Sequence, residues 1–178
     1  MTFMNSRVML ATLVIVAAGC ATNEKQPSDT GDGRVEVGMA APSYGTVSLN
    51  GDSVSLKAER GKVVLLNVWA TWCHPCRSEI PELRAIHAAY QQRGLELIGV
   101  SVDTEGNDEN IRQFMKEFQM TFPVWRDPDE RISTKFFTIG VPATFLIDKQ
   151  GILRWRKTGP IAPHDSTLKA AIERALEP

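Results

Sequence analysis

The sequence of 178 residues is short of cysteine and histidine, with three of each, and its charges nearly cancel to a formal net charge of −1. Without an excess of basic residues the chain has no electrostatic footprint for nucleic acid, and we expect no nucleic-acid partner. A zinc site needs four ligands, usually two cysteine pairs or one pair with spaced histidines. Here one cysteine pair is closely spaced, and His74, His87 and His164 lack ligand spacing. The pattern therefore predicts no metal site, and nothing in it implies an organic cofactor.

Long apolar runs are also missing. The uncharged run after Arg7 ends at Ala18, well short of the roughly 20 residues that a membrane-spanning helix needs. A short apolar run behind one basic residue is typical of a secretion signal. Small residues then lead into Cys20, as in a bacterial lipobox, although Ala17 stands where leucine is usual. We predict a signal peptide over residues 1–19 and a lipid on Cys20. An uncleaved anchor, or a plain signal with an incidental cysteine, are the alternatives.

The segment after this cysteine is polar and has no apolar periodicity, so it cannot bury enough surface to fold by itself. We predict that residues 20–38 form a flexible tether that starts at the lipidated cysteine. Residues 39–178 are enough for one domain with its own core. The expected location is extracytoplasmic and membrane-anchored, which means the periplasmic side in a Gram-negative cell.

Two cysteines three positions apart form the central motif of the sequence. Cys73 and Cys76 follow the apolar run 63–68 and precede a helical pattern. The N-terminus of a helix carries partial positive charge and lowers the pKa of a cysteine placed there. The second cysteine lies one turn further along the same face, close enough for a disulfide. We therefore predict a redox-active disulfide in which Cys73 attacks and Cys76 resolves.

The run Val-Leu-Leu-Asn-Val-Trp-Ala-Thr-Trp-Cys-His-Pro-Cys, which ends at Cys76, resembles the thioredoxin superfamily. It is most similar to the membrane-tethered, extracytoplasmic thiol–disulfide oxidoreductases of the TlpA/ResA-like group. The resemblance extends from about Gly38 to Leu176. It implies an α/β thioredoxin fold, with a mixed central sheet flanked by helices, an N-terminal β-hairpin and a helix–strand insertion.

Periodicity and turn residues locate the expected elements. Asn50-Gly51 predicts a hairpin turn, and Pro123 marks a short edge strand. Residues 107–109 should cap and charge the helix that follows them. The expected strands are 47–49, 53–56, 63–69, 95–102, 122–125, 145–147 and 152–155, and the expected helices are 73–93, 111–118, 129–137 and 165–176.

The resemblance also implies roles for residues around the cysteines. Pro142 should follow a cis peptide bond beside the pair, and Trp72 and Val141 should contact the substrate. Glu79 should assist proton transfer, although an exposed helix position is the alternative. Asn67 stands where thioredoxin has a buried acid, and an amide there can form hydrogen bonds but cannot titrate.

The direction of electron flow depends on two residues between the cysteines. Pro75 matches thioredoxin, a reductant, whereas a charged His74 would stabilise the Cys73 thiolate and make the pair more oxidising. The tether favours a reductant that a membrane electron donor of the thiol–disulfide type recharges. The expected partners are protein substrates with disulfides or thiols, for example in cytochrome c maturation or oxidase assembly.

Four alternatives remain: a disulfide-forming oxidase, a copper-binding assembly factor, a peroxiredoxin-like peroxidase and a non-catalytic adaptor. A copper protein of the Sco type needs three residues between its cysteines and a distal histidine. A peroxidase needs a threonine three positions before its cysteine, whereas Thr71 lies two positions before Cys73.

Overall fold

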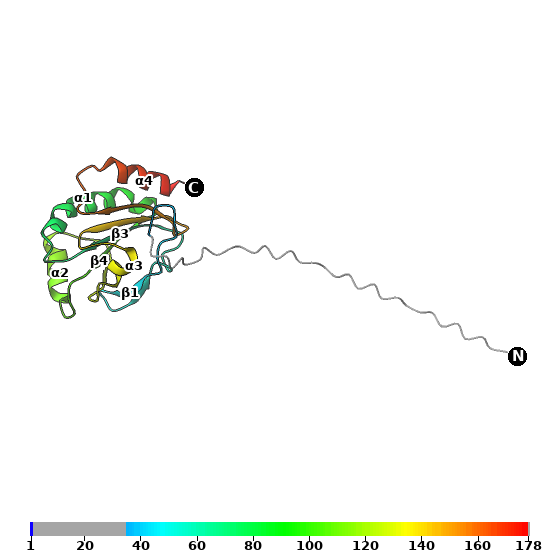
Figure 1. Ribbon diagram of the computed structural model, residues 1–178, viewed down its shortest axis with the longest axis horizontal. Coiled ribbons are helices and arrows are strands. Elements are labelled where there is room, and N and C mark those ends of the chain that lie inside the picture. The colour runs from blue at the N-terminus through cyan, green and yellow to red at the C-terminus, as the bar shows by residue number, and fades with distance from the viewer. Residues whose placement is uncertain (2–34, 178) are drawn as a thin grey trace.

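A central mixed sheet organises the computed structural model, which describes Met1 and residues 35–177. The predicted signal peptide and Cys20 lie outside the described residues. Helices α1 and α4 cover one face of the sheet, and α3 lies on the other face (Figure 1). The sheet has seven strands in the order β2-β1-β5-β4-β3-β6-β7. The predicted mixed sheet flanked by helices is therefore confirmed.

The strands are β1 (Gly45–Ser48), β2 (Ser53–Ser55), β3 (Val63–Trp69), β4 (Leu95–Ser101), β5 (Val124–Arg126), β6 (Ala143–Ile147) and β7 (Leu153–Thr158). The helices are α1 (His74–Tyr90), α2 (Asp108–Glu117), α3 (Arg131–Phe136) and α4 (Ser166–Leu176).

The centre of the sheet consists of three apolar strands. Strand β3 pairs in parallel with β4 and antiparallel with β6. Every residue of β3 is buried, including Asn67, because helices cover both faces of the sheet at this point. The carboxyl end of β3 leads directly into the two cysteines, so a fully buried strand that is paired on both sides positions the redox motif.

The N-terminal hairpin forms as predicted, with Gly51 in its turn at a φ of +91° that glycine adopts without strain. Strand β1 also pairs antiparallel with β5. The expectation that the segment around Pro123 is an edge strand is therefore wrong. The hairpin covers that edge, and this pairing between distant segments leaves no signal in the local sequence.

The inserted helix α2 buries Ile111 and Phe114, as its periodicity predicts. Its expected cap is wrong in one respect, because the side chain of Asn107 does not bond to the backbone of the first turn. The Asn107 oxygen instead accepts a hydrogen bond from the side chain of Asn110 at 2.7 Å. Asp108 and Glu109 still place negative charge in the first turn, where the helix dipole favours it.

Helix α1 ends slightly earlier than expected. After Tyr90 the chain forms a 3-10 turn over Gln91–Arg93 and leaves through Gly94, whose φ is +99°. The buried face of the helix includes Leu83, Ile86 and Tyr90, as predicted. No helix within residues 35–177 is both long and apolar enough to cross a bilayer.

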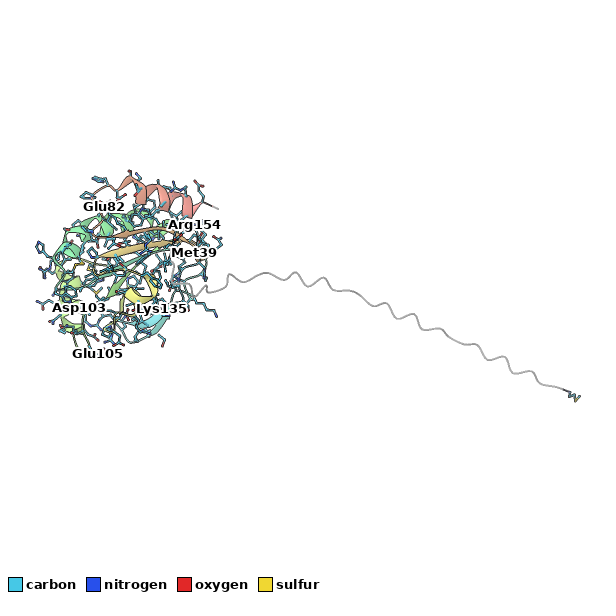
Figure 2. All side chains as sticks on the ribbon, in the orientation of Figure 1. Met39, Glu82, Asp103, Glu105, Lys135 and Arg154 are labelled. Carbon is cyan, nitrogen blue, oxygen red and sulfur yellow. A yellow bond between two sulfur atoms is a disulfide. The ribbon has the colours of Figure 1, made fainter. Side chains whose placement is uncertain are left out.

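Residues 35–41, here called the lead-in segment, run beside the start of β7. Leu153 donates its backbone N–H to the carbonyl of Met39 at 2.8 Å, and Figure 2 shows Met39 next to Arg154. Val35 is 6% exposed and belongs to the core cluster. The last four residues of the predicted tether, 35–38, are therefore packed on the domain. Their two valines are too few to give a periodic pattern, which is why the sequence placed them outside it.

Candidate active site

The two cysteines form a disulfide at the N-terminus of α1, with their Cα atoms 5.3 Å apart. Cys73 is the N-cap residue, and its sulfur accepts a hydrogen bond from the backbone N–H of Cys76 at 3.1 Å. The two residues are 3% and 1% exposed. When the disulfide opens, the same N–H and the helix dipole stabilise a thiolate on Cys73.

The residues around the pair divide into exposed and buried ones. His74 and Pro75 occupy the first turn of α1 and are exposed. A proline in this turn costs little, because its missing N–H has no partner within the helix. Trp72, directly before the first cysteine, is 64% exposed. A partner that reaches the disulfide therefore meets an indole ring and an imidazole first.

Pro142 follows a cis peptide bond from Val141, as predicted. Ala143, the first residue of β6, pairs with Val68 near the end of β3. This register places the cis-proline at the edge of the sheet from which the chain enters the cysteine loop. Pro142 is buried, whereas Val141 is partly exposed.

Glu79 is a buried acid one turn after the second cysteine. Its side chain is 1% exposed and accepts two hydrogen bonds, from the Asn67 amide at 2.8 Å and from the backbone N–H of Ile161 at 2.7 Å. Burial raises the pKa of Glu79 from 4.5 to about 7, against the opposing effects of these two bonds and of the charge on Lys157. The alternative of an exposed helix position is therefore wrong.

This acid lies on the same face of α1 as the second cysteine. Glu79 and Cys76 lie three residues apart on the buried face of α1, and side chains at this spacing are neighbours. A carboxyl group whose pKa lies near neutrality is suited to accept and return a proton at working pH. Asn67, which also donates to Thr144 Oγ1 at 3.0 Å, orients the carboxyl group and does not titrate.

The sequence did not single out Asp103, which fixes the loop before the cysteines. Its carboxylate accepts hydrogen bonds from the backbone N–H of Thr71 at 3.0 Å and from the hydroxyl of Ser101 at 2.7 Å. Arg77 donates to the carbonyl of Thr71 at 2.9 Å. Asp103 follows β4, the neighbour of the strand that carries the cysteines, and this position was the one available signal.

Helix α2 packs against the end of β3 and the start of α1. The ring of Phe114 stacks on Trp69, with centroids 5.0 Å apart, and the guanidinium of Arg77 lies 5.5 Å from its centroid. Gly99 makes room for this arrangement, since a Cβ there would lie 2.7 Å from the Trp69 indole nitrogen. The insertion therefore supports both the end of β3 and the start of α1.

Within residues 35–177, no three His, Cys, Asp or Glu side chains are grouped so that they could hold a metal ion. The reactive groups seen at the site are the two cysteine sulfur atoms, with the buried carboxyl group of Glu79 on the same helix.

Comparisons with known proteins agree with this geometry. A model of the AhpC/TSA family matches residues 37–156. The thiol-disulfide oxidoreductase ResA of Bacillus thuringiensis subsp. konkukian is 35% identical over 122 residues, which cover 68% of this chain and 69% of that protein. The ResA protein of Geobacillus kaustophilus is also 35% identical, and the match covers 80% of this chain and 78% of that protein.

Among solved structures, the candidate thiol:disulfide interchange protein DsbE from Chlorobium tepidum superposes with a TM-score of 0.73 at 28% identity. The match covers 81% of this chain and 100% of that chain. The fold, the disulfide and the relatives all agree with the resemblance seen in the sequence, which is therefore confirmed. The chain belongs to the AhpC/TSA family and is a ResA-like thiol-disulfide oxidoreductase with a thioredoxin fold.

Proposed function

We propose that this enzyme reduces disulfides of protein substrates outside the cytoplasm, held at the membrane by a lipid on Cys20. Assembly of c-type cytochromes or of oxidase copper sites would give it such substrates. The observation that carries the thiol–disulfide exchange in this proposal is the buried Glu79 behind the Cys73–Cys76 disulfide, with a pKa of about 7. It gives the resolving cysteine a proton acceptor that works at neutral pH.

The proposed reaction moves two electrons from the enzyme dithiol to the substrate. The Cys73 thiolate attacks one sulfur of the substrate disulfide, and the other substrate sulfur leaves as a thiolate. Glu79 takes the proton of Cys76, whose thiolate then attacks the sulfur of Cys73. The bond between Cys73 and the substrate breaks, the second substrate thiolate leaves, and the enzyme disulfide remains.

The surface around the disulfide suits a polypeptide substrate. Trp72 is 64% exposed, and Phe137 and Ile139, in the loop before the cis-proline, are 55% and 93% exposed. Val141 stands before β6 and outside its pairing ladder, so its backbone can pair with an extended chain. We propose that Trp72 and Val141 contact the segment that carries the substrate disulfide.

The reductant assignment rests on Pro75 and on the predicted membrane tether, because a reductase in an oxidising compartment needs a membrane donor to recharge it. The exposed His74 favours the second candidate, a disulfide-forming oxidase, since its charged form would stabilise the thiolate of Cys73. The two functions differ in the direction of net electron flow and can be separated by assay.

The direct test compares insulin reduction by the reduced enzyme with oxidation of a reduced, unfolded protein by the disulfide form. We expect insulin reduction to be faster, and Cys76→Ser to trap substrates on Cys73 as mixed disulfides. A protein that is oxidised in cells and oxidises substrates faster than it reduces insulin would contradict the reductant assignment. Stoichiometric copper binding by the reduced pair would favour an assembly factor instead.

The proposed anchor is tested separately. Cys20→Ala should release the protein from the membrane fraction or block processing of the signal. Unchanged processing and fractionation of this variant would remove the lipid anchor from the proposal and leave the redox chemistry unaffected.

A further inference from the structure

A row of polar side chains crosses three neighbouring strands on the face covered by α1 and α4. Asn67 of β3 pairs in register with Thr144 of β6, and Thr144 pairs with Lys157 of β7. Residues directly opposite one another share a face of the sheet, with Cβ atoms about 4.5–5.5 Å apart. Asn67 and Thr144 are fully buried, whereas Lys157 on the edge strand is partly exposed. The row therefore leads from the amide that holds Glu79 to a cation at the border with solvent.

The cation is held in place. The Lys157 ammonium forms an ion pair with Asp165 at 3.0 Å, and the two side chains are 32% and 12% exposed. Asp165 is also the N-cap of α4 and accepts hydrogen bonds from the backbone N–H groups of Thr167 and Leu168. Four residues earlier, the N–H of Ile161 bonds to Glu79. The same loop thus fixes both the carboxyl group and the ion pair.

Few charges act on Glu79 from the elements around it. Strands β3 and β6 present the neutral Asn67 and Thr144, β7 presents Lys157, and the start of α4 presents Asp165. Helix α1 itself adds the two cysteines. Lys157 is the cation whose charge favours the ionised form of Glu79.

We propose that Lys157, held by Asp165, is a positioning residue that sets how readily Glu79 accepts the proton of Cys76. This inference rests on the proposed role of Glu79. Lys157 does not touch the sulfur atoms. Its positive charge stabilises the carboxylate, and the negative charge of Asp165 offsets part of that effect. The pair therefore keeps both the protonated and the ionised form of Glu79 accessible.

The pair can be tested because its members act in opposite directions. Lys157→Met removes a positive charge and should raise the pKa of Glu79. Asp165→Asn removes a negative charge and should lower it, while asparagine remains an equally good N-cap. Each change should be on the order of half a unit. Lys157→Arg keeps the charge and should restore wild-type behaviour, and Lys169→Met on the exposed side of α4 is the matched control.

Two readouts separate this inference from the proposed function. The first is an NMR titration of the Glu79 carboxyl carbon in the oxidised protein, assigned with Glu79→Gln, which does not depend on activity. The second is the acid limb of the pH–rate profile for insulin reduction, which should move in the same direction as the NMR titration. Thermal unfolding checks that each variant is folded.

Opposite shifts in both readouts would support the inference. If Lys157→Met and Asp165→Asn move the NMR titration the same way, or leave it unchanged, the inference is wrong whatever the enzyme catalyses. If the titration moves as expected but the acid limb persists in Glu79→Gln, Glu79 is not the proton acceptor. That result would overturn the proposed mechanism and with it the positioning role of Lys157 in catalysis.

Discussion

The side-chain amide of Asn67 donates a hydrogen bond to the carboxyl group of Glu79 at 2.8 Å, between strand β3 and helix α1. The amide fixes the position of the acid. Because an amide does not titrate, Glu79 is the member of this pair that can gain or lose a proton. Because the carboxyl group is buried, its ionisation is coupled to folding and, under the proposed mechanism, also to catalysis.

We expect the oxidised protein to lose stability as pH rises through this titration. The folded pKa of about 7 lies above the ordinary 4.5, so the folded state holds more protons between these values. The free energy of unfolding should therefore fall with rising pH between about 4.5 and 7. The full loss is about 3 kcal/mol, measurable by urea unfolding at a series of pH values. Glu79→Gln should remove most of this dependence, and a stability that is flat or rising from pH 5 to 7 would contradict the assignment.

Glu79→Gln should also slow the resolving step. The variant keeps the shape of the side chain but cannot accept the proton of Cys76, so the mixed disulfide should persist about tenfold longer or more. Rapid alkylation followed by mass spectrometry measures its lifetime. Glu82→Gln, three residues further along α1 and partly exposed, is the matched control and should react like the wild type. Equal lifetimes in both variants would remove Glu79 from the reaction.

His74→Gly should make the dithiol more reducing. A charged imidazole in the first turn of α1 stabilises the thiolate of the neighbouring Cys73, and its loss raises the energy of the reduced form. We expect a change of up to about tenfold in the equilibrium with dithiothreitol, which corresponds to about 30 mV. Alkylation of the equilibrated proteins gives the ratio. An unchanged potential would show that His74 has no tuning role.

Asp103→Ala should destabilise the domain and loosen the loop before the cysteines. The backbone N–H of Thr71 and the Ser101 hydroxyl lose their buried acceptor, which costs roughly 1–3 kcal/mol. Denaturant unfolding measures the loss, and faster hydrogen exchange at the Thr71 amide locates it. Asp103→Asn keeps one acceptor oxygen and should lose less. If both variants match the wild type, Asp103 does not hold the loop.

Much of the fold could be predicted because its central elements have local signals. The β-branched run of β3, the Asn-Gly turn and the periodic helices each follow from a short window of sequence. The position of β5 inside the sheet could not be predicted, because it depends on pairing with a hairpin about 75 residues earlier in the chain. The packing of Val35 in the core could not be predicted for the same reason.

The residues of the candidate site also divide into those with a local sequence signal and those whose position depends on distant parts of the chain. The cysteine pair and the cis-proline have compact motifs, whereas the burial of Glu79 depends on which face of α1 meets the sheet and on the loop that carries Ile161. Lys157 lies beyond the strand expected at 152–155, and its place opposite Thr144 follows only from the longer β7 and its register with β6.

The lead-in segment also bears on how the sheet is protected from other chains. Its backbone already occupies the outer edge of β7 at Leu153, and residue Ala40 forms a bridge with Ile152. The remaining edge carries Arg154, Arg156 and Lys157, and such charges discourage two copies from joining edge to edge. Edge-to-edge pairing of two copies is therefore disfavoured at this border by the chain itself. The backbone at Val141 lies outside that border and outside the pairing of β6, and under the proposed function it is the place where a substrate strand would pair.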